Sequence, residues 1–168
     1  MMISAVEKFL ADALGARFAV LLCSMLPILE LRGGIPLGMA LGLPWWQSFL
    51  FAVIGNMLPV PLILVFVGRV IAWMSRSKVE FFRKFGTWLF KKAKKNRERI
   101  EKYSFFGICL FVAVPLPATG AWTGSLVAAC IGMRFWKALL STLIGVLIAA
   151  TTVTLICYGA LAALRFLL

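Results

Sequence analysis

The sequence predicts an all-α integral membrane protein with an inverted repeat, in which each half is a re-entrant helical hairpin followed by a transmembrane helix. Of the 168 residues, 62% are hydrophobic and 14% are charged, whereas about a quarter of the residues in a soluble domain are charged. The apolar residues form runs of about 20, the length that a bilayer core requires of a helix. Proline and glycine interrupt two of these runs, at positions that match when the chain is shifted by 90 residues.

Helices rather than strands are expected in every spanning element. Lipid offers no hydrogen bonds to the backbone, so only helices and closed barrels cross a bilayer. Barrel strands would appear as segments of about ten residues with alternating polarity, and the sequence has none. We also expect no removable signal peptide, because Glu7 and Asp12 stand where its basic residues would be.

The first element is a weakly amphipathic segment, 1–16, which predicts a short interfacial helix. The run 17–43 follows and would be about 40 Å long as one helix, but Pro27, Gly33, Gly34 and Pro36 interrupt it. The apolar pieces 18–26 and 35–43 would each cover about 13 Å, near half of the bilayer core. Irregular backbone at that depth is tolerated where protein or a wet cavity surrounds it. We therefore expect a re-entrant hairpin over 17–43.

Residues 45–73 predict a transmembrane helix, with Trp45 and Trp46 as interfacial anchors and basic residues at its other end. Asn56, Pro59 and Pro61 lie inside this helix, and we expect them to kink it. The hairpin and this helix together form repeat 1, residues 17–75.

Residues 76–102 contain eleven Lys or Arg against three Glu, with apolar residues at helical spacing. This pattern predicts a basic amphipathic helix on an anionic leaflet, and its charge places the loop in the cytoplasm. Nucleic-acid binding is the alternative interpretation of such a patch. Membrane topology already accounts for these charges, so we expect no nucleic acid as a partner.

Repeat 2, residues 103–168, follows the same plan. A hairpin is expected over 104–133, where Pro115, Pro117, Thr119 and Gly120 separate two apolar pieces, 105–114 and 121–131. A transmembrane helix is expected over 135–165. The chain is thus one membrane domain, residues 1–168.

An internal duplication is indicated by residues that recur at the 90-residue offset. Leucine and isoleucine matches are common in this composition, but proline, glycine and tryptophan matches are less so; the latter are Pro27/Pro117, Gly34/Gly124, Gly42/Gly132, Trp46/Trp136 and Gly55/Gly145. One transmembrane helix separates the repeats, so they would be inverted in the membrane, with the first hairpin entering from outside. Inverted repeats with broken helices are a recurrent plan of transporters.

The candidate site centres on Glu30 and Arg32, the ionisable residues deep within an apolar stretch. Such residues are costly in lipid and mark a pathway, a coupling site or a partner. Glu30 is a candidate for proton exchange, and the guanidinium of Arg32 suits phosphate or carboxylate. The alternative interpretation is a structural ion pair that closes the hairpin.

Free N–H groups at the starts of the second half-helices would complete an anion site. We expect Gly33, Gly34 and Pro36 to open that helix in the first hairpin, and Thr119, Gly120 and Thr123 to do so in the second. The glycines are equally compatible with close helix packing. Asn56 is a further candidate, although a packing hydrogen bond explains it as well.

Catalysis and metal binding are not indicated. The chain has no histidine and six acidic residues, so the commonest metal ligand and a carboxylate cluster are both missing. The four cysteines lie in apolar stretches without a C-x-x-C spacing and are expected to be apolar fillers. We expect no enzyme activity, no cofactor and no metal.

Two strings carry a likeness to a known family, ELRGGIPLG (30–38) and VPLPATGAWTG (114–124). With the basic loop between them, they resemble the putative small multi-drug export protein family, which is similar to the DedA superfamily and looks like a branch of it. The resemblance spans about residues 17–165. It implies opposed re-entrant hairpins and translocation of lipids, notably undecaprenyl phosphate, with a dependence on proton motive force. It also implies site roles for Glu30, Arg32, Pro117 and Gly120.

The leading hypothesis is therefore a transporter of the prokaryotic inner membrane that moves an amphiphile such as an anionic lipid carrier, coupled to protons. The alternatives are a proton-coupled exporter of small, often cationic compounds and a non-transporting membrane organiser. Membrane lipids are the expected partners, and a homodimer is compatible with the small number of membrane elements.

Overall fold

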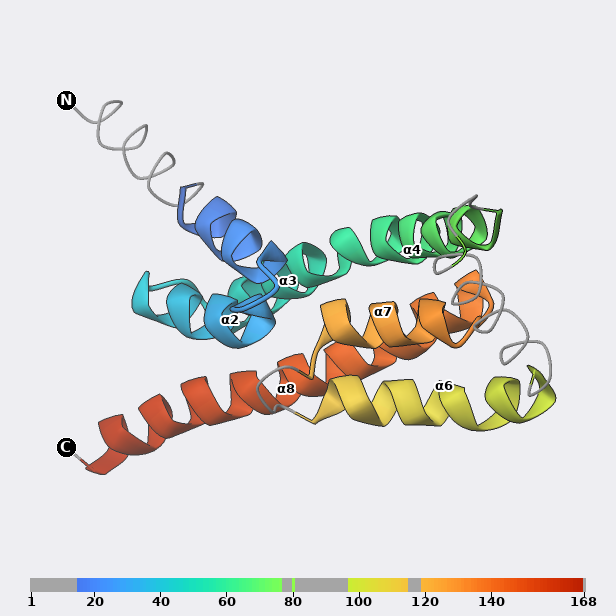
Figure 1. The fold of residues 1–168 in the computed structure, drawn as a ribbon. Coiled ribbons are helices and arrows are strands. Elements are labelled where there is room, and N and C mark those ends of the chain that lie inside the picture. Colours follow the sequence, from blue (N-terminus) through green and yellow to red (C-terminus); the bar gives the residue numbers. More distant parts are fainter. Residues whose placement is uncertain (1–14, 77–79, 81–96, 115–118, 168) are drawn as a thin grey trace. The chain divides into compact units, whose positions relative to one another are not determined.

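The computed structural model describes residues 15–76, 80, 97–114 and 119–167, and the regular structure in these ranges is helical (Figure 1). A first helix, Gly15–Met25, carries no label in the figure. It is followed by α2 (Glu30–Ala40), α3 (Trp45–Met57), α4 (Pro59–Arg76), α6 (Arg97–Ala113), α7 (Ala121–Cys130) and α8 (Phe135–Leu167). The predicted interfacial helix 1–16 and the centre of the predicted basic helix 76–102 lie outside the described residues.

In the part of the chain that the structure describes, two helical stretches are long and apolar enough to cross a membrane. They are Trp45–Val70 and Phe135–Ala160, each of 26 residues, and a helix of that length rises about 39 Å. Gly15–Met25, Tyr103–Ala113 and Ala121–Cys130 are apolar but shorter. The two long stretches coincide with the helices predicted over 45–73 and 135–165.

The first apolar run is broken at Pro27, as predicted, but the break is shorter than the one expected from Pro27 to Pro36. The chain turns at residues 26–29, around Pro27, and α2 begins at Glu30. The prediction that Gly33, Gly34 and Pro36 open the second helix is therefore wrong: the glycines lie within α2, and Pro36 is inside it. Two short helices can turn at one proline, because the tight turn satisfies its own backbone, with Glu30 N–H donating to the Leu26 carbonyl at 2.9 Å.

The interruption within the first long stretch is found where its prolines predict it. The helix α3 ends at Met57 and α4 begins at Pro59, with Leu58 between them. Proline is favoured at the first position of a helix, where its missing N–H is not needed.

Farther along, α6 runs from Arg97 to Ala113, so helix continues across the boundary predicted between the basic segment and the second hairpin.

The same succession of elements recurs at an offset of 90 residues. The helix α2 ends in a turn at Gly42 and α7 in a turn at Gly132, and both glycines have φ of 74°. The N–H of the residue after each glycine returns to the helix, from Leu43 to the Gly38 carbonyl at 2.9 Å and from Met133 to the Ala128 carbonyl at 3.0 Å. Glycine ends helices in this way because it adopts positive φ without a steric cost.

The described helices belong to two compact units. One unit holds the helix Gly15–Met25, α2, α3 and the part of α8 from Leu147 onward, and the other holds α4, α6, α7 and the part of α8 up to Val146. The first unit thus combines three helices of the first half of the chain with the end of α8. The second unit combines α6, α7 and the start of α8 with α4 from the first half.

Glycines set the helix contacts in the first unit. A Cβ at Gly34 would collide with Ser24 of the first helix, and one at Gly55 would collide with the backbone of Leu21. A Cβ at Gly38 would likewise collide with Ser48 of α3. Small residues let helix backbones approach closely, which is how helices associate where lipid replaces water.

Candidate functional site

Glu30 is buried at the start of α2, with 6% of its surface exposed. Among the described residues it is the one ionisable side chain that is buried, and the one non-glycine residue with a left-handed backbone, at φ 50°. Such a backbone costs an L-residue roughly 1–2 kcal/mol, and strained positions of this kind cluster at functional sites. Its carboxylate also lies at the positive end of the α2 dipole, which stabilises a negative charge.

Arg32 is half-buried in the first turn of α2. Burial disfavours its positive charge, and the negative charge of Glu30 offsets part of that cost. The two residues are therefore electrostatically coupled across one helical turn, and not within an unwound segment as the sequence suggested.

The glycines of this segment have a packing role. Gly34 lies against the Val20 carbonyl and Ser24, and a Cβ at Gly33 would come within 3.0 Å of Leu29. The Gly33 N–H already donates to the Leu29 carbonyl at 2.9 Å. That N–H group is thus engaged within the chain, which corrects the expectation that the glycines present free donors to an anion.

Asn56 is the second polar group of the first unit with an unusual environment. It is 1% exposed, and neither its Nδ2 nor its Oδ1 has a hydrogen-bond partner in the described structure. Gly38 of α2 lies against Ser48 of α3. Glu30 comes eight residues before Gly38, and Asn56 comes eight residues after Ser48. In this antiparallel helix pair, Glu30 and Asn56 therefore lie at the same level, each about 12 Å from the Gly38–Ser48 contact.

The candidates of the second hairpin form a local cap at the start of α7. The Gly120 N–H donates to Thr123 Oγ1 at 3.0 Å, and Thr119 Oγ1 donates to the Val114 carbonyl at 2.9 Å. The first bond caps the start of α7, and the second satisfies a carbonyl just after the end of α6. Pro117 lies outside the described residues. The structure thus groups Glu30, Arg32 and Asn56 in one unit and Thr119, Gly120 and Thr123 in the other.

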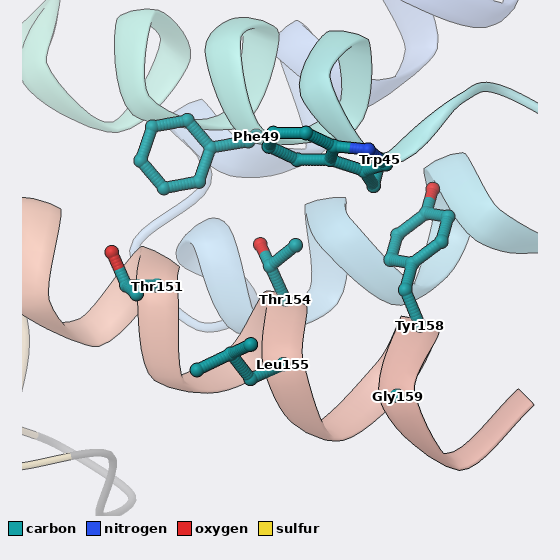
Figure 2. A pocket seen from close by; sticks show the side chains of 7 residues that line it. All are labelled: Trp45, Phe49, Thr151, Thr154, Leu155, Tyr158 and Gly159. Atoms are coloured by element: carbon teal, nitrogen blue, oxygen red, sulfur yellow. The ribbon is translucent and has the colours of Figure 1, made fainter. Parts of the chain in front are cut away.

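A pocket in the first unit was not predicted from the sequence. It has a volume of about 440 Å³ and lies between α3 and the C-terminal part of α8 (Figure 2). Its lining is almost entirely apolar, and seven residues form it, Trp45, Phe49, Thr151, Thr154, Leu155, Tyr158 and Gly159.

Hydrogen bonds of the Tyr158 hydroxyl hold one end of this pocket in place. Tyr158 Oη donates to the Leu43 carbonyl at 2.9 Å and lies 2.6 Å from Ser48 Oγ, which joins α8 to the turn between α2 and α3. Thr154 is 7% exposed, and its Oγ1 has no partner in the described structure. Thr151, Thr154 and Tyr158 are spaced by three and four residues, a helical face that the sequence displays and that could have indicated the site.

Comparison with known proteins gives one match. The family model described as Putative small multi-drug export protein matches residues 30–152, about three quarters of the chain. No curated protein and no solved structure matches the chain. The matched residues include Glu30, Arg32, Asn56 and the helix start at Gly120.

Proposed function

The chain belongs to the Putative small multi-drug export protein family, and from this premise we propose that it exports small amphiphilic compounds across a cell membrane. The family and the two long apolar stretches make it a membrane protein. The observation that carries the proposal is Glu30, a carboxylate that is buried and held on a strained backbone. The same unit contains Asn56, a buried amide without a hydrogen-bond partner in the described structure.

In this proposal the carboxylate of Glu30 couples export of the compound to uptake of a proton. When ionised, it attracts a cationic compound; when it gains a proton, the attraction is lost and the compound leaves. Arg32 would balance the negative charge of Glu30 while the site is empty, because the two side chains interact electrostatically. Each export step would consume one proton from the outer side.

The proposed architecture is a pair of re-entrant hairpins inverted in the membrane, one per repeat. The matching glycine turns at Gly42 and Gly132 and the apolar helices of half-membrane length support it. The basic segment 76–102 would lie on the cytoplasmic, anionic leaflet of a prokaryotic inner membrane. We propose a transport protein rather than an enzyme, working as a monomer or homodimer with membrane lipids as its neighbours.

The test is efflux of ethidium, a cationic aromatic dye, from bacterial cells that lack their own ethidium exporters. Cells producing the full chain should lose preloaded dye faster than cells with an empty vector. Glu30→Gln should reduce efflux to the vector level, and Glu80→Gln, the same change at an exposed residue, should leave it intact. Membrane quantities of the variants are compared by immunoblot. Wild-type efflux from Glu30→Gln would refute the role of this carboxylate.

A second candidate function is translocation of an anionic lipid carrier such as a polyprenyl phosphate. Arg32 favours it, because a half-buried guanidinium near a helix start suits a phosphate. Liposomes with a fluorescent polyprenyl phosphate would decide between the two. Lipid translocation should stop with Arg32→Ala and continue with Glu30→Gln, whereas a cation exporter requires Glu30.

A further inference from the structure

The pocket between α3 and α8 lies at the ends of the two long apolar stretches. Trp45 is the first residue of one stretch, and Gly159 is next to the last residue of the other, Ala160. A pocket at this level is close to the boundary between lipid and water, where tryptophan and tyrosine are enriched. Its position suits a compound with one apolar and one polar end.

Size and lining resemble those of small-molecule sites. A volume of about 440 Å³ falls in the range of about 300–1,000 Å³ that such sites occupy. Figure 2 shows the rings of Trp45 and Phe49 on α3 facing α8, with the ring of Tyr158 at one end. Aromatic walls favour a ring over an aliphatic chain, because offset and edge-to-face contacts add to the area buried. Among the described residues, no charged side chain lines the pocket, so a charged end of the ligand would stay outside.

On α8, one position of the pocket lining is a glycine and therefore carries no side chain. Gly159 belongs to the lining, and a Cβ there would meet nothing within 4 Å. This glycine is therefore not required for helix packing, unlike Gly34 or Gly55. Its effect is to leave room beside α8.

One hydroxyl group of the lining is unused. Thr151 Oγ1 donates to the Leu147 carbonyl at 2.8 Å, and Tyr158 Oη is bonded to Leu43. Thr154 Oγ1 has no partner in the described structure and is covered within the wall; Figure 2 shows it directed toward the α3 side. An unpaired buried hydroxyl is costly, and a ligand would supply its partner.

We propose that this pocket binds the ring system of an aromatic amphiphile, with Thr154 forming one hydrogen bond to it. The inference rests on the proposed export function and names the chemical class of its substrate. The pocket lies seven to eleven residues along α3 from Asn56, about 10–16 Å, and so is a site separate from Glu30, where a compound is held at the membrane boundary.

The test uses the full chain in lipid nanodiscs and N-phenyl-1-naphthylamine, a neutral aromatic dye that accepts energy from tryptophan. Binding is read as energy transfer, with empty nanodiscs subtracted. Gly159→Leu should weaken binding by about tenfold or more, because leucine fills the ligand's volume. Gly68→Leu is the matched control, since a Cβ at Gly68 also meets nothing within 4 Å, and it should bind as wild type.

Thr154→Val should weaken binding about fivefold, the loss of one hydrogen bond. Thr142→Val is its control, because Thr142 Oγ1 is also buried without a partner but lies outside the pocket. Unchanged binding by Gly159→Leu would overturn the proposal, and so would displacement of the dye by dodecanol as effectively as by naphthalene, which would identify an alkyl chain as the occupant.

The outcome is separable from that of the export assay. Dye binding that Gly159→Leu abolishes, in a protein that does not export ethidium, would uphold the pocket and refute export. Ethidium export by wild type together with unchanged dye binding by Gly159→Leu would uphold export and refute the pocket.

Discussion

Replacement of Gly55 by alanine should destabilise the protein, although alanine is the better helix former. A Cβ at Gly55 would collide with the carbonyl oxygen of Leu21 and come within 3.0 Å of the Leu21 carbonyl carbon. These are backbone atoms of the neighbouring helix, so relief requires the two helices to separate. Overpacking of this kind costs about 1–3 kcal/mol.

The matched control is Gly68→Ala, in α4. A Cβ there would meet nothing within 4 Å, so the change should have only its local effect, a gain of roughly 0.5–1 kcal/mol from helix propensity. The two substitutions are chemically identical, and their predicted effects have opposite signs because one helix face is packed against backbone and the other is open.

Thermal unfolding of the purified protein in detergent, followed by circular dichroism at one scan rate, measures the difference. At roughly 2–4 °C per kcal/mol for a chain of this size, Gly55→Ala should lower Tm by about 2–12 °C, and Gly68→Ala should raise it slightly. If Gly55→Ala were as stable as Gly68→Ala, the close approach of the first helix to α3 would be refuted.

The remaining predictions concern single contacts, and the same unfolding measurement checks them. Gly145→Ala should lower Tm as Gly55→Ala does, because its Cβ would lie 2.7 Å from the Cys109 carbonyl oxygen; an unchanged Tm would contradict this packing. Asn56→Leu should raise Tm by several degrees, since it removes two buried polar atoms without partners, and a lower Tm would mean that Asn56 is satisfied. Tyr158→Phe should lower Tm by about 2–6 °C through the loss of its hydrogen bonds, and an unchanged Tm would contradict the bond to the Leu43 carbonyl.

Prediction of the helices from the sequence was accurate where the apolar composition of a run or the position of a proline decides the structure. The apolar stretches beginning at Trp45 and Phe135 were identified, because a run of that length without charges has few alternatives to a membrane helix. The interruption near Pro59 was identified because proline cannot continue the hydrogen bonding of a helix.

The extent of the first break was not predicted, although its position at Pro27 was. Gly33 and Gly34 suggested an unwound centre, but glycine in a helix costs only about 1 kcal/mol, which close packing against Ser24 and Val20 can repay. Local propensity was overridden by a contact between segments. The same contact decides that Gly34 serves packing rather than an anion site.

The sequence by itself determined that this chain is helical, apolar enough for lipid, and divided by prolines and glycines at a repeated spacing, because each of these properties follows from the residue types and their order. Only the tertiary structure decided the left-handed, buried state of Glu30, the burial of Asn56 without a hydrogen-bond partner in the described structure, and the pocket lined by Trp45 and Tyr158. Trp45 and Tyr158 are 113 residues apart in the chain, and helical periodicity reports which face of a helix is distinctive but not which distant helix will cover it.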